Sequence, residues 1–488
     1  MFELTVLPDN KTISVPQGQS VMDALQTAGV YLDAPCGGQG KCGKCKVIID
    51  GKEVLACETK VDRDLRVTIP QKSGLNVLQT GIQVTHELAP AREGHLLAFD
   101  IGTTSVVCFL LNGTTGEEMA KSSMLNPQTA FGADVISRIQ AALRGDLEAQ
   151  AKAIREGMTQ LIREACRDGK VDPAEIGVVS VVGNPAMQQL FLGVSPENLA
   201  GVPFAPVLTK AEMTPCADVL PICPNALLLT IPDISGYIGA DTMGCVLSTE
   251  LYQKEELTLM VDIGTNGEMV LGNKDRMIAC STAAGPALEG ANIQFGMRGT
   301  EGAIDHVWLE DGQLRCSVIG GGTAKGICGS GLIDAIAVGL TAGLINKRGR
   351  IMNEEHSIRL TDTVYLSQDD IRQVQLAKGA IYAGIYLMAK QLGFAVTDIQ
   401  KVQLAGAFGS FLNPASACRM GLLPEELLSK IEAVGNAAGS GAKMLACNAA
   451  LMPLTQELTR KIEFLELASL PDFSRTFAKA GNFREETL

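Results

Sequence analysis

The N-terminal part of the chain alternates between apolar and polar side chains in short runs. Residues 2–7 and 11–15 have the period of two that is typical of strands, with a turn-forming Pro-Asp-Asn between them, which predicts a β-hairpin. Residues 21–28 have apolar side chains at helical spacing, and residues 46–50 and 53–56 form a second alternating pair. The pattern therefore predicts a small module in the order strand, strand, helix, loop, hairpin.

A second region of regular apolar patterning follows an irregular stretch. Between about Gln71 and Gly94 the sequence contains Gly, Pro and charged residues without periodicity, which indicates a boundary between domains. We expect an N-terminal domain at 1–75, a linker at 76–94 and a second domain at 95–488. The length agrees with this division, since 488 residues are too many for one ordinary hydrophobic core.

Two strand–turn–strand segments in the second domain share one pattern, an apolar run that ends in Asp-Ile-Gly-Thr. The first contains Asp100 and the second contains Asp262, about 160 positions later. An isolated Asp-X-Gly-Thr is common in β-turns, where the aspartate caps a hairpin. Two copies between apolar strands instead predict two duplicated α/β lobes that clasp a nucleotide, one from about residue 95 and the other from about residue 258.

Each copy places a carboxylate at the end of a buried strand, beside a turn rich in backbone N–H and hydroxyl donors. Such a turn suits a phosphate, and such a carboxylate suits Mg²⁺ and its bound waters. We therefore expect Asp100 and Asp262 to organise Mg²⁺ and the water that attacks the nucleotide. The predicted phosphate-binding residues are Thr103, Thr104, Gly264, Thr265, Asn266 and Gly267.

Two glycine-rich stretches late in the chain complete the expected nucleotide site. An apolar strand leads into Gly406 and Gly409, and a second stretch contains Gly435 and Gly439. Glycine lets a flat purine and its ribose approach the backbone closely, so we expect these four residues beside adenosine. For the second stretch, a close contact between two helices is an equally good interpretation.

Two further polar and glycine-rich segments, 126–138 and 183–190, receive no role from their composition alone. For 281–290, lining of the cleft, contact with a partner and a structural turn are all open, and 326–334 is a glycine loop that leads into an apolar helix. Cys328, in the last of them, is interpreted as a packed small thiol rather than a redox group.

Four cysteines lie close together at Cys36, Cys42, Cys45 and Cys57. Their spacing, C-x5-C-x2-C-x11-C, is one residue longer in the first gap than the plant-type ferredoxin spacing. Structural zinc sites usually present two paired C-x2-4-C motifs, and only one such pair is present here. We therefore favour a [2Fe–2S] cluster with these four ligands over zinc, and we expect Cys57 on the return strand of the hairpin that follows the loop.

Composition argues against several classes of function. A net charge of −13 speaks against nucleic acid and anionic membranes as partners, and four separated histidines speak against a histidine metal site. The N-terminus lacks the pattern of a signal peptide and no apolar run has the length of a membrane span, so we expect a cytoplasmic protein. The ten other cysteines, from Cys108 to Cys447, are expected to be buried thiols.

About the first 75 residues resemble the [2Fe–2S] ferredoxin family, which implies a β-grasp fold. The two Asp-Ile-Gly-Thr turns and the later Leu-Ala-Gly-Ala-Phe-Gly resemble the ASKHA superfamily of acetate and sugar kinases, seventy-kilodalton heat-shock chaperones and actin. In that superfamily the two turns are the phosphate-1 and phosphate-2 hairpins. The expected fold class is therefore α/β multidomain, with a β-grasp [2Fe–2S] ferredoxin-like domain followed by a two-lobed ASKHA ATPase domain.

Both modules in this order resemble the reductive activators of corrinoid enzymes, and the resemblance includes Asn-Pro-Gln and Gly-Ile-Cys-Gly-Ser-Gly. It implies an ATPase-coupled metalloreductase that returns a Co(II) corrinoid to Co(I), with a [2Fe–2S] cluster, ATP and Mg²⁺. It also implies a corrinoid protein of a methyltransferase system as partner, a low-potential electron donor and a homodimer. Well-known members carry a middle domain between the two modules; only about twenty residues separate them here, so we expect that domain to be missing.

Two other functions fit the same parts. One is ATP-dependent electron activation of a radical dehydratase, although those activators hold a [4Fe–4S] cluster between two ASKHA subunits, and the ATPase region here shows no suitable pair of cysteines. The other is a redox sensor whose cluster state controls ATP-dependent binding to a regulator.

Overall fold

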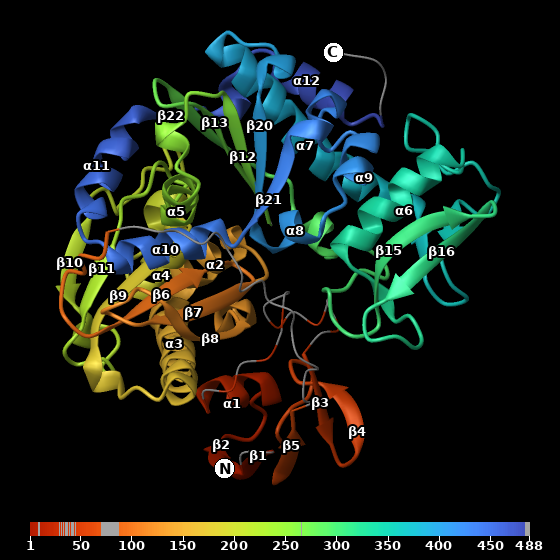
Figure 1. Ribbon diagram of the computed structural model, residues 1–488. Helices are drawn as coiled ribbons and strands as arrows, with labels where there is room; N and C mark the ends of the chain where they lie inside the picture. The colour runs from red at the N-terminus through yellow and green to blue at the C-terminus, as the bar shows by residue number, and fades with distance from the viewer. Residues whose placement is uncertain are drawn as a thin grey trace. The chain divides into compact units, whose positions relative to one another are not determined.

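The computed structural model describes residues 1–7, 10–28, 30, 32, 34, 38, 40, 43, 45–69, 87–264 and 266–483. Contacts among them divide the chain into two compact units. The described residues of the first unit fall within 1–72, 86–239 and 445–452, and those of the second fall within 240–444 and 453–488. Figure 1 shows helices and strands of both units, with labels where there is room.

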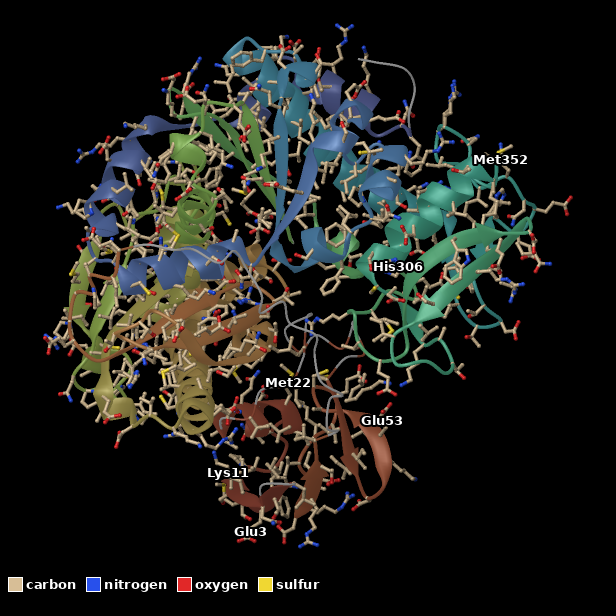
Figure 2. All side chains as sticks on the ribbon, in the orientation of Figure 1. Glu3, Lys11, Met22, Glu53, His306 and Met352 are labelled. Atoms are coloured by element: carbon tan, nitrogen blue, oxygen red, sulfur yellow. The ribbon has the colours of Figure 1, made fainter. Side chains whose placement is uncertain are left out.

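The N-terminal module of the first unit is a five-stranded sheet with strand order β2-β1-β5-β3-β4 and one helix, α1. β1 pairs antiparallel with β2 and parallel with β5, and Ser20 caps α1 by accepting from the backbone N–H of Asp23. Lys11 on β2 and Glu53 on β4 are exposed (Figure 2). The hairpins and the helix confirm the predicted order, whereas β5 was not predicted. The bounds are β1 Phe2–Leu7, β2 Lys11–Val15, α1 Val21–Thr27, β3 Lys46–Ile49, β4 Lys52–Leu55 and β5 Leu65–Thr68.

The larger part of the first unit is a six-stranded sheet with strand order β10-β11-β9-β6-β7-β8. Every residue of β9 is buried, as expected for a strand covered on both faces of a sheet. Helix α3 packs against β7 and β8. The bounds are β6 His95–Ile101, β7 Ser105–Leu111, β8 Glu118–Leu125, α2 Val135–Ala141, α3 Leu147–Gly169, β9 Ile176–Gly183, α4 Pro185–Leu192, β10 Glu212–Pro215 and β11 Leu227–Thr230.

The second unit is built on another six-stranded sheet, with strand order β21-β20-β12-β13-β14-β22. Helix α7 packs against β13 and β14, and α8 packs against β12 and β20. The bounds are α5 Ala240–Ser248, β12 Thr258–Ile263, β13 Gly267–Gly272, β14 Met277–Thr282, α7 Gln368–Leu392, β20 Lys401–Ala405, α8 Gly406–Phe411, β21 Ile431–Gly435, α10 Ala437–Cys447, α11 Leu451–Lys461 and β22 Ile462–Phe464.

The two six-stranded sheets share a common five-stranded topology. In each, a three-stranded antiparallel meander (β6-β7-β8 or β12-β13-β14) is followed by two parallel strands beside its first strand (β9 and β11, or β20 and β21). The Asp-Ile-Gly of each motif lies at the same place in both, where the first strand of the meander ends before the second begins. The predicted duplication is therefore confirmed at the level of topology.

A smaller sheet in the second unit, of order β16-β15-β17, packs against helix α6. Its bounds, with those of the neighbouring elements, are β15 Ala303–Glu310, β16 Gln313–Val318, β17 Gly326–Ile327, α6 Gly329–Thr341, β18 Ser357–Arg359, β19 Tyr365–Ser367, α9 Pro414–Arg419 and α12 Phe473–Ala480. Across the residues that the structure describes, no helix is both long enough and apolar enough to cross a membrane.

Candidate functional site

The phosphate-1 turn joins β6 to β7 in the first unit. The backbone N–H of Gly102 donates to the carbonyl of Ser105 at 2.9 Å, which closes the turn. Asp100 is half-buried near the end of β6, between β7 and β9 in the sheet. Thr103 and Thr104 occupy the turn itself. The predicted residues of this unit, Asp100, Thr103 and Thr104, are therefore brought together at the carboxyl end of β6.

Three side chains from later in the chain contact this turn. Asn126 donates to the carbonyl of Gly102 at 2.8 Å, Arg138 donates to the carbonyl of Thr103 at 2.5 Å, and the Asn184 amide donates to the Thr103 hydroxyl at 3.1 Å. The sequence drew attention to the segments that contain these residues, but gave them no role. Their contacts span 24 to 81 positions, so only the fold reveals them.

The phosphate-2 turn joins β12 to β13 in the second unit. The backbone N–H of Gly264 donates to the carbonyl of Asn266 at 2.9 Å, and Gly267 begins β13. Asp262 lies next to Ala405 of the parallel strand β20. The predicted Thr265 lies outside the described residues.

Gly406 follows β20 and lies against the Asp262 carboxylate. Its φ of 79° is in the left-handed region, and a Cβ atom at this position would overlap Asp262 Oδ1. Glycine is required here because both the backbone conformation and the close carboxylate exclude a side chain. The structure thus joins two predicted site residues, Asp262 and Gly406, through direct contact.

The other predicted glycines have different surroundings. Gly409 is buried in α8, where a Cβ atom would press on Leu404, and the backbone N–H of Gly439 donates to Asn436 Oδ1 at 2.6 Å. Gly435 ends β21 with a φ of 67°. Their contact with adenosine remains a prediction.

The second glycine stretch also makes the close helix contact that was the alternative interpretation. A Cβ atom at Gly441 of α10 would collide with the backbone of Gly244 in α5. Beside it, the Ser248 hydroxyl donates to the carbonyl of Ala437 at 2.7 Å. Helix packing therefore accounts for Gly441.

Glu268 is an acidic residue that the sequence interpretation did not select. It lies opposite Asp262 on the antiparallel ladder of β12 and β13, and the Ser281 hydroxyl donates to its Oε1 at 3.4 Å. Burial raises the pKa of Glu268 well above its usual value, and the charges of Asp241 and Asp262 raise the pKa further. The signal that could have found it is its position, one strand away from a predicted catalytic aspartate.

No group of three or more histidine, cysteine or acidic side chains in the described part of the chain is arranged to hold a metal ion. This finding does not conflict with a Mg²⁺ site of the predicted kind. Mg²⁺ usually keeps several waters and binds one or two carboxylates together with substrate phosphates, rather than an all-protein cage. Asp100 and Asp262 are each suited to such a role.

Two of the four predicted cluster ligands, Cys45 and Cys57, lie within the described residues. Their Sγ atoms are 3.2 Å apart, and Cys45 is buried. The backbone N–H of Ala56 donates to the carbonyl of Cys45 at 2.8 Å, which fixes Cys45 against the turn beyond β4. Cys36 and Cys42 lie outside the described residues.

The expectation that Cys57 lies on the return strand was wrong. β4 ends at Leu55, and Cys57 lies in the turn that follows. Within that turn, the sulfur of Cys57 lies 3.2 Å from that of Cys45.

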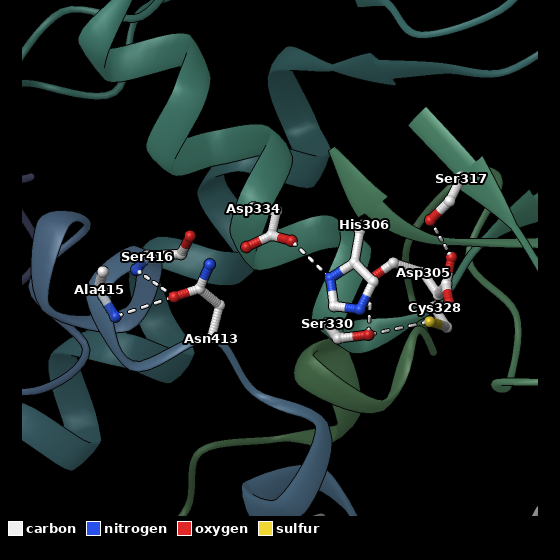
Figure 3. A network of polar contacts seen from close by, with 9 residues as sticks. All are labelled: Asp305, His306, Ser317, Cys328, Ser330, Asp334, Asn413, Ala415 and Ser416. Carbon is white, nitrogen blue, oxygen red and sulfur yellow. Dashed lines mark hydrogen bonds and ion pairs between the residues drawn. The ribbon is translucent and has the colours of Figure 1, made fainter. Parts of the chain in front are cut away.

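A polar network surrounds the start of α6 in the second unit (Figure 3). His306 Nδ1 and Asp334 Oδ2 lie 3.0 Å apart, and the Ser330 hydroxyl donates to the carbonyl of Asp305 at 2.9 Å. Cys328 is buried, with its Sγ 3.4 Å from the Ser330 hydroxyl. These surroundings agree with the interpretation of Cys328 as a packed thiol.

Comparison with known proteins decides the family. The chain is 32% identical to the corrinoid activation enzyme RamQ of Eubacterium limosum, and the alignment covers 98% of each protein. The chain belongs to the RACo family of reductive activators of corrinoid proteins. The resemblance inferred from the sequence motifs is therefore confirmed.

Other relatives agree with this membership in the RACo family. The chain is 26% identical to the [Co(II) methylated amine-specific corrinoid protein] reductase of Methanosarcina barkeri, over 78% of this chain and 75% of that protein. A solved structure titled "Reductive activator for corrinoid,iron-sulfur protein" is 27% identical, with a TM-score of 0.75, and the match covers 100% of this chain and 99% of that one. The similarity to RACo proteins is thus not confined to one domain of the chain.

Three parts of this RACo chain each match a different family description. Residues 4–67 match the 2Fe-2S iron-sulfur cluster binding domain, residues 96–254 match the RACo middle region, and residues 256–488 match the C-terminal domain of RACo, the ASKHA domain. The expected fold class is confirmed. The expectation that the middle domain is missing was wrong, because the segment that we interpreted as the first ATPase lobe is the middle region of the family.

The difference in length from other members is nevertheless real. The alignment with RamQ runs over 584 positions, whereas this chain has 488 residues, so RamQ carries residues that have no counterpart here.

Proposed function

We propose that this RACo protein transfers one electron to the Co(II) of a partner corrinoid protein, giving Co(I), and that ATP binding and hydrolysis drive the capture and release of that partner. The observation that carries this proposal is the full-length relationship to RamQ. The Methanosarcina relative supports the oxidation state of the substrate, since its name specifies a Co(II) corrinoid protein. The methylated-amine system of that relative supports a corrinoid partner from a methyltransferase system.

Cys36, Cys42, Cys45 and Cys57 are the proposed ligands of a [2Fe–2S] cluster, which when bound supplies a one-electron carrier of low potential. The geometry of Cys45 and Cys57 fits two ligands of one metal atom. A disulfide needs an S–S distance of about 2.05 Å, and 3.2 Å is well beyond it. Two thiolate sulfurs bound to one tetrahedral metal atom, at a metal–sulfur distance of about 2.3 Å, would lie about 3.8 Å apart. Small movements of the two side chains would give this separation.

The proposed nucleotide contacts follow the two turns. Thr103 and Thr104 in the first unit, and Gly264, Thr265, Asn266 and Gly267 in the second, would donate to phosphate oxygens. Asp100 and Asp262 would hold the waters of Mg²⁺ and orient the attacking water. Gly406, Gly409, Gly435 and Gly439 would lie beside adenosine. The contact of Gly406 with the Asp262 carboxylate supports a shared site for these two residues.

ATP is needed in this proposal because the family resemblance implies a Co(II)/Co(I) couple of lower potential than the cluster, so the electron transfer runs uphill. A plant-type cluster has a potential of about −400 mV. Each 59 mV by which the acceptor's potential lies below the donor's lowers the equilibrium constant of a one-electron transfer about tenfold. A nucleotide offsets this difference only through unequal affinity for two conformations, and a shift from 1:99 to 99:1 takes about 5.5 kcal/mol. In the proposed cycle, the ATP-bound protein binds the Co(II) partner and would change the environment of the cobalt, which raises the potential of the cobalt towards that of the cluster. Hydrolysis of ATP then releases the Co(I) partner.

The remaining parts of the proposal are a homodimer, a separate low-potential electron donor and a cytoplasmic location without nucleic acid or membrane partners. The net charge of −13 supports the absence of polyanionic partners.

A mixing experiment tests the proposed reaction. The cluster-loaded protein, a strong reductant and a Co(II) corrinoid protein are combined without oxygen, and the visible spectrum is followed with and without MgATP. Formation of Co(I) that depends on both the protein and ATP is the expected result. Nucleotide-dependent binding of the partner without any Co(I) would instead indicate a redox sensor.

A further inference from the structure

Two carbonyl groups of the phosphate-1 turn are fixed by buried side chains. Asn126 and Arg138 are both 0% exposed. The Asn126 amide donates to the carbonyl of Gly102 at 2.8 Å, and Arg138 Nη2 donates to the carbonyl of Thr103 at 2.5 Å. The two donors hold the turn on the side that faces the protein interior. Asn126 directly follows β8, and Arg138 lies in α2.

The orientation of the Asn126 amide is set by its own backbone contacts. Its Oδ1 accepts from the backbone N–H of Gln128 at 2.9 Å, so its Nδ2 is the group that meets Gly102. Arg138 is fixed in the same way, because its Nε donates to the carbonyl of Gly132 at 3.0 Å. Neither side chain is free to leave the turn without breaking a second hydrogen bond.

Fixing a carbonyl also fixes the N–H of the next residue. In a trans peptide the C=O and the following N–H point in opposite directions. With the carbonyls of Gly102 and Thr103 directed at Asn126 and Arg138, the N–H groups of Thr103 and Thr104 point away from the protein interior. Successive outward N–H groups form an anion-binding concavity, and the nearby guanidinium charge adds to its attraction for an anion.

The hydroxyl of Thr103 is oriented by Asn184, the N-cap residue of α4. Asn184 Oδ1 accepts from the backbone N–H of Met187 at 3.0 Å, so Nδ2 is the group that meets Thr103 Oγ1 at 3.1 Å. A threonine hydroxyl has one proton. Because Thr103 Oγ1 accepts from Asn184, that proton remains available for donation to another acceptor.

We propose that Asn126, Arg138 and Asn184 are positioning residues that aim two backbone N–H groups and the Thr103 hydroxyl at one phosphate group of the bound nucleotide. This inference rests on the proposed ATP binding and deepens it. It assigns a role to the segments 126–138 and 183–190, in which these residues lie, and it limits the ligand class to phosphate esters presented to the phosphate-1 turn.

The first test is a double-mutant cycle between Asn184 and Thr103, read as the Kd for MgATP by calorimetry. Asn184→Ser keeps an N-cap oxygen for α4 but removes the amide that meets Thr103, and Thr103→Val removes the hydroxyl with little change in shape. Each single variant is expected to bind MgATP about tenfold more weakly, as for the loss of one hydrogen bond to a charged group. The double variant is expected to be no weaker than Thr103→Val alone.

The second test compares two arginines of the same unit that donate to backbone carbonyls. Arg138→Lys keeps the charge but cannot reach both Thr103 and Gly132, and it is expected to weaken MgATP binding about tenfold. Arg155→Lys is the matched control, since Arg155 Nε donates to the carbonyl of Phe191 at 2.8 Å, away from the turn. The control is expected to bind MgATP within twofold of the wild type. Thermal unfolding of each variant shows whether the fold is retained.

The outcomes separate the two proposals. If the wild-type protein shows no saturable binding of MgATP, the proposed ATP function fails and the positioning role fails with it. If the wild type binds MgATP but Asn184→Ser and Arg138→Lys bind it equally well, only the positioning role is overturned. The positioning role would also be overturned if the losses of MgATP affinity in the Asn184 and Thr103 single variants multiplied in the double variant. That result would show that Asn184 does not act through the Thr103 hydroxyl.

Discussion

The sulfur atoms of Cys45 and Cys57 lie 3.2 Å apart, although twelve positions separate the two residues in the chain. The β3–β4 hairpin folds the intervening segment back on itself, and the hydrogen bond from Ala56 to Cys45 holds its two ends together. Half of the proposed ligand set is thus brought together by the β-sheet of the N-terminal module.

Replacing Cys57 tests this pair as cluster ligands. Cys57→Ser is expected to lose most of its iron and the visible absorption of the cluster after anaerobic reconstitution, because a serine oxygen is a poor substitute for a thiolate ligand of iron. Cys316→Ser, a half-buried thiol of the second unit, is the control and should keep both. Iron and acid-labile sulfide analysis gives the answer, and full cluster content in Cys57→Ser would remove Cys57 from the ligand set.

Replacing Asp262 tests its role in ATP hydrolysis. Asp262→Asn keeps the shape of the side chain but removes the charge proposed to hold the waters of Mg²⁺, so kcat should fall at least about a hundredfold, corresponding to about 3 kcal/mol. Asp275→Asn, in the exposed turn between β13 and β14, should leave hydrolysis unchanged. Wild-type turnover by Asp262→Asn would show that the phosphate-2 carboxylate has no part in the reaction.

A comparison of two glycines with similar φ values separates the effect of backbone strain from the effect of the contact with Asp262. Gly406 and Gly393 have φ values of 79° and 81°, but only at Gly406 would a Cβ atom meet another residue, the Asp262 carboxylate. Alanine at either position should cost about 1–2 kcal/mol of stability. Only Gly406→Ala should also lower ATP hydrolysis, by about a hundredfold, because it displaces Asp262. Equal hydrolysis rates in the two variants would contradict this role of the contact.

The raised pKa of Glu268 predicts a pH dependence of stability. Burial, with the charges of Asp241 and Asp262, makes the folded protein hold this proton more tightly than the unfolded chain does. The unfolded chain releases the proton first as the pH rises above the usual value of 4.5, so the free energy of unfolding falls from there up to the folded pKa. Glu268→Gln should reduce this fall and be more stable than the wild type at the upper end of the range.

Denaturant unfolding of the nucleotide-free protein at several pH values measures the effect of Glu268. Glu354→Gln, at an exposed position, is the control and should show the same slope as the wild type. A Glu268→Gln variant that keeps the full pH dependence would assign it to other groups.

The sequence predicted those features that depend on short motifs. The repeated Asp-Ile-Gly-Thr was enough to predict two duplicated α/β lobes, because each motif lies between two recognisable apolar strands, but the strand order of their sheets was not predicted. The strand β5 was missed because it does not form a hairpin with the strand before it, and its parallel partner β1 lies far away in the sequence. Cys57 was misplaced by two residues because cysteine spacing does not show where a strand ends.

The contacts around the phosphate-1 turn could not be predicted in the same way. Asn184 meets Thr103 across 81 positions, and only the parallel pairing of β6 with β9 brings the start of α4 to that turn. Glu268 was overlooked for a related reason, because its importance depends on the ladder that places it opposite Asp262.

The central claim is that ATP drives the reduction of Co(II) in the partner. The most direct measurement is the steady-state fraction of Co(I) in a solution poised at the potential of the cluster, with the corrinoid partner and with MgATP, MgADP or no nucleotide. The account predicts substantial Co(I) with MgATP and very little with MgADP or without nucleotide. Equal Co(I) fractions under all three conditions would contradict it.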